Sequence, residues 1–593
     1  MESVAELNYR KGVALHGAGD FSGALAAFDA ALLAAPQLPA ALYNKAMVLI
    51  QLQRWQDALA VLDELVSSNP GIADAWNNRS GVLQALGRNE EALESIRQVL
   101  KLRPSDVRAL YNAGIVLLVL KRFDEAQQFL TRALAADPNN GEILGSLVSA
   151  ALRACDWETL EPLLPRLFSG VRKGTAMVAP LTLLALSDDP ILQRRCAELT
   201  TARSLAAAAL AGGVPPMAQT AYRHDRIRIG YLSSDFGDHP VAAQIVGLLE
   251  RHDRSRFEVI GLFTGRADGS AKYNRVVKAC DQFRSIGPIG ARDAASLIRE
   301  AELDILVDLN GHTMGWRPAI LKYRPAPVIA TFLGYAGTTG ADFVDYIIGD
   351  PHVTPFDLGP AMSEKIVQLP DCFWPSDPAL AEPEAVTRAD AGLPSGAFVF
   401  CCFNSNHKIR PPIFDAWVRL LQSVPESVLW MRDADAAVNG RFRRQAEMRG
   451  VDPARLHFAG RMENFARHLG RQAQADLFLD TFPYNAHATA SDALWAGLPV
   501  VTLRGESFVS RVSSSLLANI GLEELVAGTP EEYEAIALSL ARDRNRLRDL
   551  RHRLTSARKT AALFDMDRFV SGIEKAYLHM QARRGESPEA FKV

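Results

Sequence analysis

The sequence contains little cysteine and no long apolar run. Its 593 residues include six cysteines, and no two of them have the C-x-x-C spacing. Neither a disulfide framework nor a structural zinc site is therefore expected, and we expect no bound metal. The longest nearly apolar stretch, residues 205–218, is interrupted by glycine and proline, and it is shorter than the roughly 20 residues that span a bilayer. No secretory signal opens the chain. These absences predict a protein of the reducing cytoplasm without a membrane span.

An excess of either charge is also missing. Lys and Arg number 65, Asp and Glu 68, and the formal net charge is -3. Such a balance does not favour an electrostatic nucleic-acid binder, so no nucleic acid partner is expected. The G-x-G-x-x-G and G-x-x-x-x-G-K-[ST] patterns are absent as well. A dinucleotide-dependent redox enzyme and a P-loop NTPase are therefore disfavoured.

The first part of the chain repeats with a period of 34 residues. Proline, alanine and a small residue each recur in four successive units, at 36, 70, 104 and 138, at 24, 58, 92 and 126, and at 12, 46, 80 and 114. This period is that of tetratricopeptide helix pairs, in which the small residues allow close helix packing and the proline ends the second helix. Four clear units run from about residue 5 to 140, and a degenerate fifth begins near Gly141. We predict an all-α tetratricopeptide superhelix over residues 1–172.

Asparagines recur inside this array. Asn44, Asn78 and Asn112 share one repeat position, and Asn77 precedes the second of them. Stacked repeats form a concave surface that typically binds extended peptides, and an asparagine side chain can bond a peptide backbone whatever its sequence. The array is therefore predicted to bind a protein or peptide. The alternatives are a spacer or a dimerisation module, and a homo-oligomer stays possible.

Beyond a helical linker at 173–222, with a boundary near Pro215, the pattern changes. Short apolar runs alternate with helical stretches, which is typical of parallel sheets whose strands are buried on both faces. We predict two Rossmann-like α/β lobes, at 223–390 and 391–593. The expected strands are 227–233, 257–263, 305–309, 328–333 and 346–348 in the first lobe, and 398–403, 427–431, 456–458, 477–479 and 500–503 in the second.

Two segments of the second lobe suit a phosphate group. Residues 484–495 follow a predicted strand and enter a helix whose first turn has small residues, with His487 and Thr489 as additional donors. A helix N-terminus with free N–H groups binds anions, although an ordinary capped helix would look similar. Lys408 also follows a strand, in the segment FNSNHKI, where a lysine can face a diphosphate or only solvent.

Acid–base candidates follow two strands of the first lobe. Asp235 and His239 lie in SSDFGDHP, and His312 lies in DLNGHT. Catalytic groups belong at the carboxyl ends of parallel strands. Turn formation by Asp235 and Gly237 is the competing interpretation.

Taken together, the longer motifs resemble the bacterial relatives of protein O-GlcNAc transferase, of glycosyltransferase family 41. They are GYLSSDFGDHP, DLNGHT, RPAPVIATFLGYAGTTGADFVDYIIGD, FNSNHKI and DLFLDTFPYNAHATASDALWAGLPVVT. The resemblance runs from about Ala5 to about Tyr577. It implies a two-lobed GT-B architecture in which the second lobe, 391–593, binds a nucleotide sugar. It also implies inverting transfer of the sugar without a metal or other cofactor. The implied donor is UDP-GlcNAc, and the implied acceptors are Ser/Thr hydroxyls of proteins held by the repeats.

The resemblance also implies roles for single residues. Lys408 would stabilise the donor diphosphate, Asp492 would bond the ribose, and His468 would lie at the nucleotide base. Asp235 and His239 match residues considered for the general base or a proton relay. The donor-binding candidates are Asn404, Ser405, Lys408, His468, Arg471, His487, Ala488, Thr489 and Asp492; the acceptor-side candidates are His312, Arg317, Asn44, Asn78 and Asn112.

Some positions depart from the family pattern. Ala488 and Ala490 interrupt an HTTG-like segment, Phe465 replaces a lysine, Ala336 replaces a proline, and residues 180–184 lack a histidine found in animal relatives. These departures leave the sugar open. The alternatives are a flagellin glycosyltransferase that uses a CMP-activated sialic-acid-like sugar, a GDP-fucose enzyme, and an inactive repeat-containing scaffold.

Overall fold

The computed structural model describes residues 3–209, 224–377, 379–462 and 464–593. Two compact units make up the chain, Met1–Leu167 and Phe168–Val593. The boundary lies inside helix α11 (Leu164–Lys173), close to the predicted end of the repeats at residue 172. The boundary expected near Pro215 lies outside the described residues. Across the described ranges, no helix combines the length and apolar character that a membrane crossing requires.

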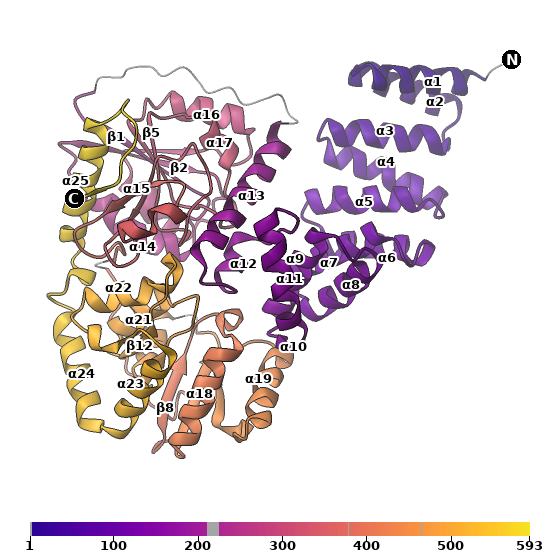
Figure 1. Cartoon of the computed structure of the whole chain (residues 1–593). Helices are drawn as coiled ribbons and strands as arrows, with labels where there is room; N and C mark the ends of the chain where they lie inside the picture. The colour runs from indigo at the N-terminus through magenta and orange to yellow at the C-terminus, as the bar shows by residue number, and fades with distance from the viewer. Residues whose placement is uncertain (1–2, 210–223, 378, 463) are drawn as a thin grey trace. The chain divides into compact units, whose positions relative to one another are not determined.

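The first unit consists of antiparallel helix pairs (Figure 1). The second helix of each of the four clear repeats ends two residues before the repeat's proline, because the residue before a proline is pushed out of the α region. A fifth repeat begins at Gly141, as expected, and its second half is broken into short pieces. The helices are α1 (Val4–Gly17), α2 (Phe21–Ala34), α3 (Pro39–Gln51), α4 (Trp55–Ser68), α5 (Ala73–Ala85), α6 (Asn89–Leu102), α7 (Val107–Val119), α8 (Phe123–Ala136), α9 (Gly141–Arg153), α10 (Trp157–Leu160) and η1 (Glu161–Leu163).

Small residues bring paired helices together, as the period predicts. A Cβ atom on Gly12 would lie 2.5 Å from a ring carbon of Phe28, and one on Gly114 would lie 2.4 Å from Cγ of Leu130. Larger side chains at these positions would separate the helices. The close packing builds an apolar core from Leu42 to Ala150 and a smaller cluster of Ala24, Phe28 and Val48 at the first repeat.

The repeated asparagines link successive repeats. The side-chain nitrogens of Asn44 and Asn78 donate to the hydroxyls of Tyr9 (3.4 Å) and Tyr43 (3.1 Å), and that of Asn112 donates to Oδ1 of Asn77 (3.4 Å). All three are half-buried. Their amide nitrogens therefore hold the array together, and peptide binding by these residues stays a prediction.

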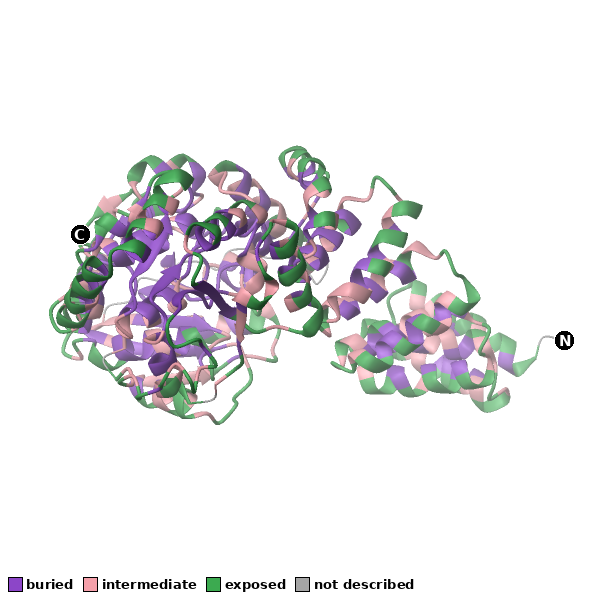
Figure 2. Ribbon diagram, turned by 90° about the horizontal axis from the view of Figure 1, so that it is seen from below, coloured by how far each residue is buried: buried purple, intermediate pink, exposed green. Residues whose placement is uncertain are grey.

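The second unit contains two parallel sheets. The first has eight strands in the order β14-β7-β6-β5-β4-β1-β2-β3. Its central strands are largely buried and its covering helices are exposed on their outer faces (Figure 2). The strands are β1 (Ile227–Ser233), β2 (Phe257–Phe263), β3 (Gln282–Ser285), β4 (Ile305–Asp308), β5 (Val328–Thr331), β6 (Tyr346–Gly349), β7 (Lys365–Gln368) and β14 (Phe591–Lys592). The helices are α12 (Pro180–Leu184), α13 (Pro190–Ala209), α14 (Pro240–Arg251), α15 (Ala271–Ala279), α16 (Ala291–Arg299), α17 (Pro318–Lys322) and η2 (Phe356–Ala361).

The second sheet has six strands in the order β10-β9-β8-β11-β12-β13. They are β8 (Phe398–Cys402), β9 (Ser427–Arg432), β10 (Leu456–Ala459), β11 (Leu477–Leu479), β12 (Val500–Leu503) and β13 (Val526–Ala527). The remaining helices are η3 (Asn406–Lys408), α18 (Pro411–Ser423), α19 (Ala436–Met448), η4 (Pro453–Arg455), α20 (Phe465–Gln472), α21 (Ala488–Trp495), η5 (Phe508–Ser510), α22 (Val512–Ala518), η6 (Glu523–Leu525), α23 (Pro530–Arg542), α24 (Arg544–Ala557), η7 (Ala562–Phe564) and α25 (Met566–Ala582).

The end of the chain returns to the first sheet, which corrects the predicted extent of the second lobe. Strand β14 pairs with β7, and α25 packs against α14. The hydroxyl groups of Tyr577 and Tyr231 are 3.1 Å apart, and Nδ1 of the buried His252 lies 2.9 Å from Glu574. Residues 566–593 therefore belong structurally with 224–369, although they follow the second sheet in sequence.

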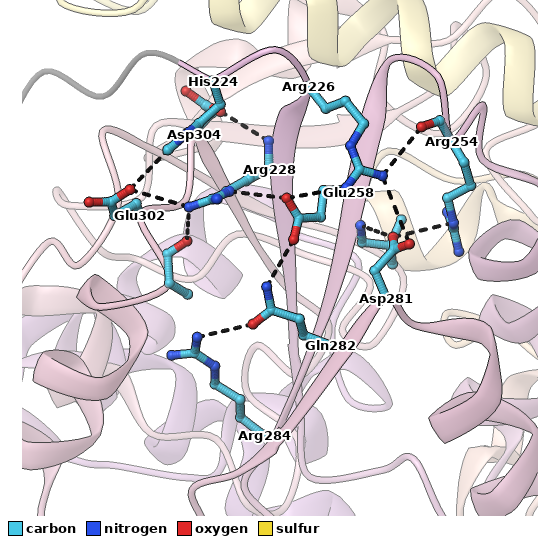
Figure 3. A network of polar contacts seen from close by, with 12 residues as sticks. His224, Arg226, Arg228, Arg254, Glu258, Asp281, Gln282, Arg284, Glu302 and Asp304 are labelled. Carbon is cyan, nitrogen blue, oxygen red and sulfur yellow. Dashed lines mark hydrogen bonds and ion pairs between the residues drawn. The ribbon is translucent and has the colours of Figure 1, made fainter.

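A polar network closes the amino ends of strands β1 to β4 (Figure 3). Oδ2 of Asp304 accepts a hydrogen bond from the backbone N–H of Arg228 (2.9 Å), and its Oδ1 accepts from Gln581 and Arg584 (2.9 Å each). Arg228 also pairs with Glu258 at 3.1 Å. The network thus fixes the end of α25 to the central strands.

The region predicted as a helical linker is part of the second unit. The hydroxyl of Thr201 in α13 donates to the carbonyl oxygen of Thr339 (2.7 Å), and Arg194 donates to the carbonyl oxygen of Pro360 (2.8 Å). Helix α13 packs on α17 and η2. The described part of the linker range is therefore a packed element of the first lobe.

Candidate functional site

The candidate residues gather where each sheet reverses its strand order. The first sheet grows outward from β1 in one direction and from β4 in the other; the second sheet does the same from β8 and β11. Loops at the carboxyl ends of such central strands are the usual ligand site of a parallel sheet. The segments that the sequence singled out lie at or shortly after the ends of these four strands: 233–240 after β1, 308–313 after β4, 403–409 after β8 and 484–495 after β11.

Lys408 lies at the reversal point of the second sheet. Its Nζ donates to the carbonyl oxygen of Asn485 (3.0 Å) and is 3.6 Å from the ring centre of Tyr484. Burial lowers the pKa of Lys408 to about 8, although the Asp480 carboxylate opposes that change. The ammonium group therefore remains largely charged at pH 7 and lies beside the turn that enters α21.

The carboxylate of Asp480 accepts hydrogen bonds from the backbone of this turn. It is fully buried, and its Oδ1 accepts hydrogen bonds from the backbone N–H groups of Thr481 and Ala486 (2.7 Å each) and from the side chain of Asn404 (3.1 Å). Asn404 in turn accepts a hydrogen bond from the hydroxyl of Thr489. Burial outweighs these hydrogen bonds and raises the pKa of Asp480. The predicted donor residues Asn404 and Thr489 are thus brought together.

His487 occupies the N-cap position of α21, and its side chain makes no capping hydrogen bond. Burial and then the charge of Lys408 hold the pKa of His487 well below its ordinary value, so the ring is neutral. Its Nε2 is buried, and no hydrogen-bond partner for it is found among the described residues. An unsatisfied buried polar atom is costly. The first turn of α21, which begins at Ala488 beside this atom, fits an anionic ligand at the helix N-terminus.

A second cluster surrounds His468 in α20. Its Nδ1 accepts a hydrogen bond from Nε of Arg471 (3.2 Å), and its Nε2 is 3.0 Å from the Gln472 side-chain amide. Burial, followed by the charges of Arg471 and Arg432, lowers the pKa of His468 to about 4. Arg432, at the end of β9, also donates to the hydroxyl of Ser405 (3.2 Å). The predicted donor residues His468 and Arg471 therefore lie in one neighbourhood with the predicted donor residue Ser405.

Asp492 lies one turn into α21. Burial raises the pKa of its carboxyl group to about 7, and the positive charge of Lys272 opposes this rise. Lys272 belongs to α15 of the first lobe, where its Nζ is 2.7 Å from Asp238. The loops of the two sheets are therefore close enough to act on one another electrostatically.

The acid–histidine pair of the first lobe is present. Oδ2 of Asp235 is 3.9 Å from Nδ1 of His239 and accepts a hydrogen bond from Asn310 (3.0 Å). Nδ1 of His239 accepts from the backbone N–H of Val241 (3.3 Å), which makes His239 the N-cap of α14. With Nδ1 used as an acceptor, the proton of the neutral ring lies on Nε2. His239 therefore presents a donor in this conformation.

The two acceptor-side candidates of the first lobe make internal contacts. His312 is 8 % exposed, its Nε2 donates to the carbonyl oxygen of Thr339 (2.8 Å), and burial lowers its pKa to about 4. Arg317 donates to the backbone carbonyls of Ile286, Gly287 and Ile289. The structure brings neither side chain into the clusters above, and Asn44, Asn78 and Asn112 belong to the other compact unit.

Several residues of the site were not singled out from the sequence. Asp480 and Asn310 lie inside the quoted motifs, but they read there as a strand end and a turn residue. Tyr484 contributes a ring face to Lys408, and Arg432 adds a cation near His468. Their position at or after the carboxyl ends of strands was the available signal for Asp480, Asn310 and Arg432, and Tyr484 begins the quoted segment 484–495.

A repeat array followed by two parallel sheets of this kind defines a tetratricopeptide-containing glycosyltransferase. The family model for glycosyl transferase family 41 matches residues 215–381 and 381–573, and tetratricopeptide models match residues 15–77 and 82–141. The chain belongs to glycosyl transferase family 41. The expected fold class and family are thereby confirmed.

Relatives and a solved structure support this assignment. The probable UDP-N-acetylglucosamine--peptide N-acetylglucosaminyltransferase SEC of Arabidopsis thaliana is 32% identical over 461 residues, which cover 74% of this chain and 47% of that protein. The Caenorhabditis elegans UDP-N-acetylglucosamine--peptide N-acetylglucosaminyltransferase is 29% identical over 462 residues, with 59% and 40% covered. A mutant O-GlcNAc transferase from Thermobaculum terrenum has a TM-score of 0.65 at 28% identity, with 92% of this chain and 97% of that one covered.

The chain spans about half the length, or less, of these two curated relatives. All three proteins are named for GlcNAc transfer, and they do not favour the flagellin alternative.

Proposed function

We propose that this chain transfers GlcNAc from UDP-GlcNAc to Ser/Thr hydroxyls of protein acceptors, with inversion at the sugar and without a metal ion. The observation that carries this proposal is the group of Lys408, the unpartnered His487 Nε2 and the first turn of α21 at the reversal point of the second sheet. The names of the relatives supply the donor, UDP-GlcNAc, and the peptide acceptor.

The donor diphosphate is bound by cationic and N–H groups in this proposal. Lys408 supplies a positive charge, and the first turn of α21 supplies backbone N–H groups and the positive end of the helix dipole. The ring of His487 also bonds the Val509 backbone, and since Nε2 has no partner, Nδ1 makes that bond and holds the proton of the neutral ring. Donation from Nε2 to a phosphate oxygen therefore requires a change of tautomer or protonation of the ring when the diphosphate binds. These groups replace the charge compensation that a divalent cation would give, and they act most strongly on the charge that develops on the leaving diphosphate.

The transfer step follows from this arrangement. The acceptor hydroxyl oxygen forms a bond to C1 of the sugar while the bond from C1 to the β-phosphate oxygen breaks, and UDP leaves with that electron pair. Attack from the face opposite UDP inverts C1. The hydroxyl proton is taken up on the acceptor side, where Asp235 and His239 are the groups proposed to relay it. Because Nε2 of His239 holds the ring proton in this conformation, the relay requires a change of tautomer.

The repeats are proposed to hold the acceptor protein. The amide nitrogens of Asn44, Asn78 and Asn112 serve the contacts between repeats, so their side-chain oxygens are the groups left to accept hydrogen bonds from a peptide backbone. Cytoplasmic location and homo-oligomerisation stay predictions that accompany this proposal.

A ligand screen followed by a transfer assay tests the proposal. Melting temperature is measured with UDP, GDP or CMP, each with and without EDTA; a ligand at 100 times its Kd adds about 2.7 kcal/mol of stability. We expect stabilisation by UDP alone, unchanged by EDTA, and then incorporation of labelled GlcNAc into Ser/Thr peptides. Stabilisation by CMP or GDP instead would refute the donor, and loss of the UDP effect in EDTA would refute metal independence.

A further inference from the structure

One carboxylate from the region before the first sheet holds a loop of the second sheet. Asp188 lies between α12 and α13, and it meets the loop of residues 505–510 that follows β12. Its oxygens accept from the backbone N–H groups of Glu506 (2.7 Å) and Ser507 (3.1 Å), and from the hydroxyls of Ser507 (2.6 Å) and Ser510 (2.5 Å). Four donors thus converge on a single side chain.

The surrounding backbone is shaped for this contact. A Cβ atom on Gly505 would lie 2.1 Å from Oδ2 of Asp188, so a residue with a side chain would displace the carboxylate. A second anchor lies nearby: Nη1 of Arg410 donates to the carbonyl oxygens of Ala185 and Leu186 (3.3 Å each). Since Arg410 comes two residues after Lys408, the segment 185–188 is fastened to two loops of the second lobe.

The loop that Asp188 holds continues to the phosphate-binding turn. The backbone N–H of Asn485 donates to the carbonyl oxygen of Val509 (3.3 Å), and the hydroxyl of Ser513 donates to the carbonyl oxygen of Ala486 (2.8 Å). Asn485 is also the residue whose carbonyl oxygen receives the hydrogen bond from Lys408. A continuous set of hydrogen bonds therefore runs from Asp188 to the groups proposed to meet the diphosphate.

We propose that Asp188 is a positioning residue of the donor site, which acts through the loop 505–510 on the turn 484–488 and on Lys408. This inference rests on the proposed function. An aspartate suits the role because its two oxygens accept all four hydrogen bonds. An asparagine would offer one acceptor oxygen and would turn its own N–H groups toward the same donors.

The adjacent residue supplies a matched control. Asp189 also accepts backbone hydrogen bonds, from Ile191 and Leu192 (3.0 Å each), and its Oδ2 is 3.0 Å from Arg172. These contacts cap α13 and do not include the loop 505–510. Asp188→Asn and Asp189→Asn therefore make the same chemical change one residue apart, and only the first reaches the donor loop.

The test measures UDP binding by isothermal titration calorimetry on the full chain, with circular dichroism to verify folding. Loss of a residue that supports a metal ligand typically costs 10–100-fold in affinity. By analogy, Asp188→Asn is expected to raise the Kd for UDP about tenfold, and Asp189→Asn less than about twofold. The double variant Ser507→Ala/Ser510→Ala removes the two hydroxyl donors and leaves the two backbone N–H groups. It is expected to weaken UDP binding in the same direction, and to add little when combined with Asp188→Asn.

The outcomes separate this inference from the proposed function. If the wild-type chain binds UDP and the folded Asp188→Asn variant binds it with the same Kd, the positioning role alone is overturned. If Asp188→Asn does not fold, an unchanged Kd in the double serine variant overturns it equally. Failure of the wild-type chain to bind UDP overturns the proposed function, and the positioning role with it.

Discussion

The protonation of Lys408 makes UDP binding sensitive to alkaline pH. Burial lowers the pKa of this lysine to about 8 from its ordinary 10.5. A diphosphate is attracted by the ammonium form and not by the neutral amine. A terminal phosphate group has its last pKa near 6, so UDP does not titrate above about pH 7.5. A change in UDP affinity above this pH therefore comes from a titrating group of the protein. We expect UDP affinity to fall as pH rises through 8.

The size of this effect follows from the fraction of charged lysine. That fraction in the free protein falls from about nine-tenths at pH 7 to about one-tenth at pH 9, so the association constant for UDP falls about tenfold. Lys408→Met removes the charge altogether. Since a hydrogen bond to a charged group contributes about 1.5–3 kcal/mol, this variant is expected to bind UDP roughly 10- to 150-fold more weakly at pH 7.

Stability changes in the opposite direction. The folded-state pKa of Lys408 lies below its unfolded value, so the unfolded chain binds more protons between pH 8 and 10.5. The contribution of this group to stability therefore rises with pH across that window, and it is lost as pH falls through 8. Without ligand, Lys408→Met is expected to unfold at a higher denaturant concentration than the wild type at pH 7.

Calorimetric titration with UDP from pH 7 to 9 is the assay. Lys408→Arg keeps its charge over this range and serves as the control that should lose the pH dependence. An alkaline decline that persists with the same midpoint in Lys408→Met would show that another group titrates, and the reasoning would fail. A flat wild-type profile would refute it as well.

Three further predictions concern the rest of the molecule. Because burial raises the pKa of Asp492 to about 7, UDP affinity should increase between about pH 6 and 7 in the wild type, before Lys408 loses its proton, and this increase should be lost in Asp492→Asn, as measured by calorimetry. Gly114→Ala places a Cβ atom 2.4 Å from Leu130, and urea unfolding should show a loss of about 1–3 kcal/mol in the repeats. Asp304→Asn leaves buried donors unpaired in the network of Figure 3, and should cost about 3 kcal/mol in the same assay; Glu302→Gln, which is 44% exposed, should cost under about 1 kcal/mol.

Much of the fold could be predicted because its signals are local. The period of 34 residues placed the repeat helices, and buried apolar runs marked β1, β2, β11 and β12 with the bounds that the structure has. Four strands were not predicted. Strand β3 is polar and only half-buried, β7 has two apolar residues, and β13 and β14 are two residues long. These strands lie at or next to a sheet edge, and they form because a neighbouring strand is already in place, which no local pattern encodes.

The site divides in the same way. The loops of Lys408, His487, Asp235 and His239 were predictable because parallel strands carry ligands at their carboxyl ends. The role of Asp480 depends on a hydrogen bond from Asn404, 76 residues away, and on hydrogen bonds from its own turn, and a sequence motif does not reveal them. His312 looked free as an isolated histidine, but Trp316 and Tyr335 enclose it, with ring centres 4.4 and 5.3 Å away.

The return of the chain to the first sheet also limits how the two lobes can move. The polypeptide crosses between the lobes twice, once after β7 and once before α25. The crossings lie side by side, since Arg568 binds both carboxylate oxygens of Asp371 (2.5 and 2.6 Å) and Arg558 binds Glu382 (2.5 Å). A single crossing of the chain would permit the lobes to rotate about any axis. Two crossings side by side restrict the lobes to rotation about one axis, so the strand ends of the two sheets stay aligned as they approach.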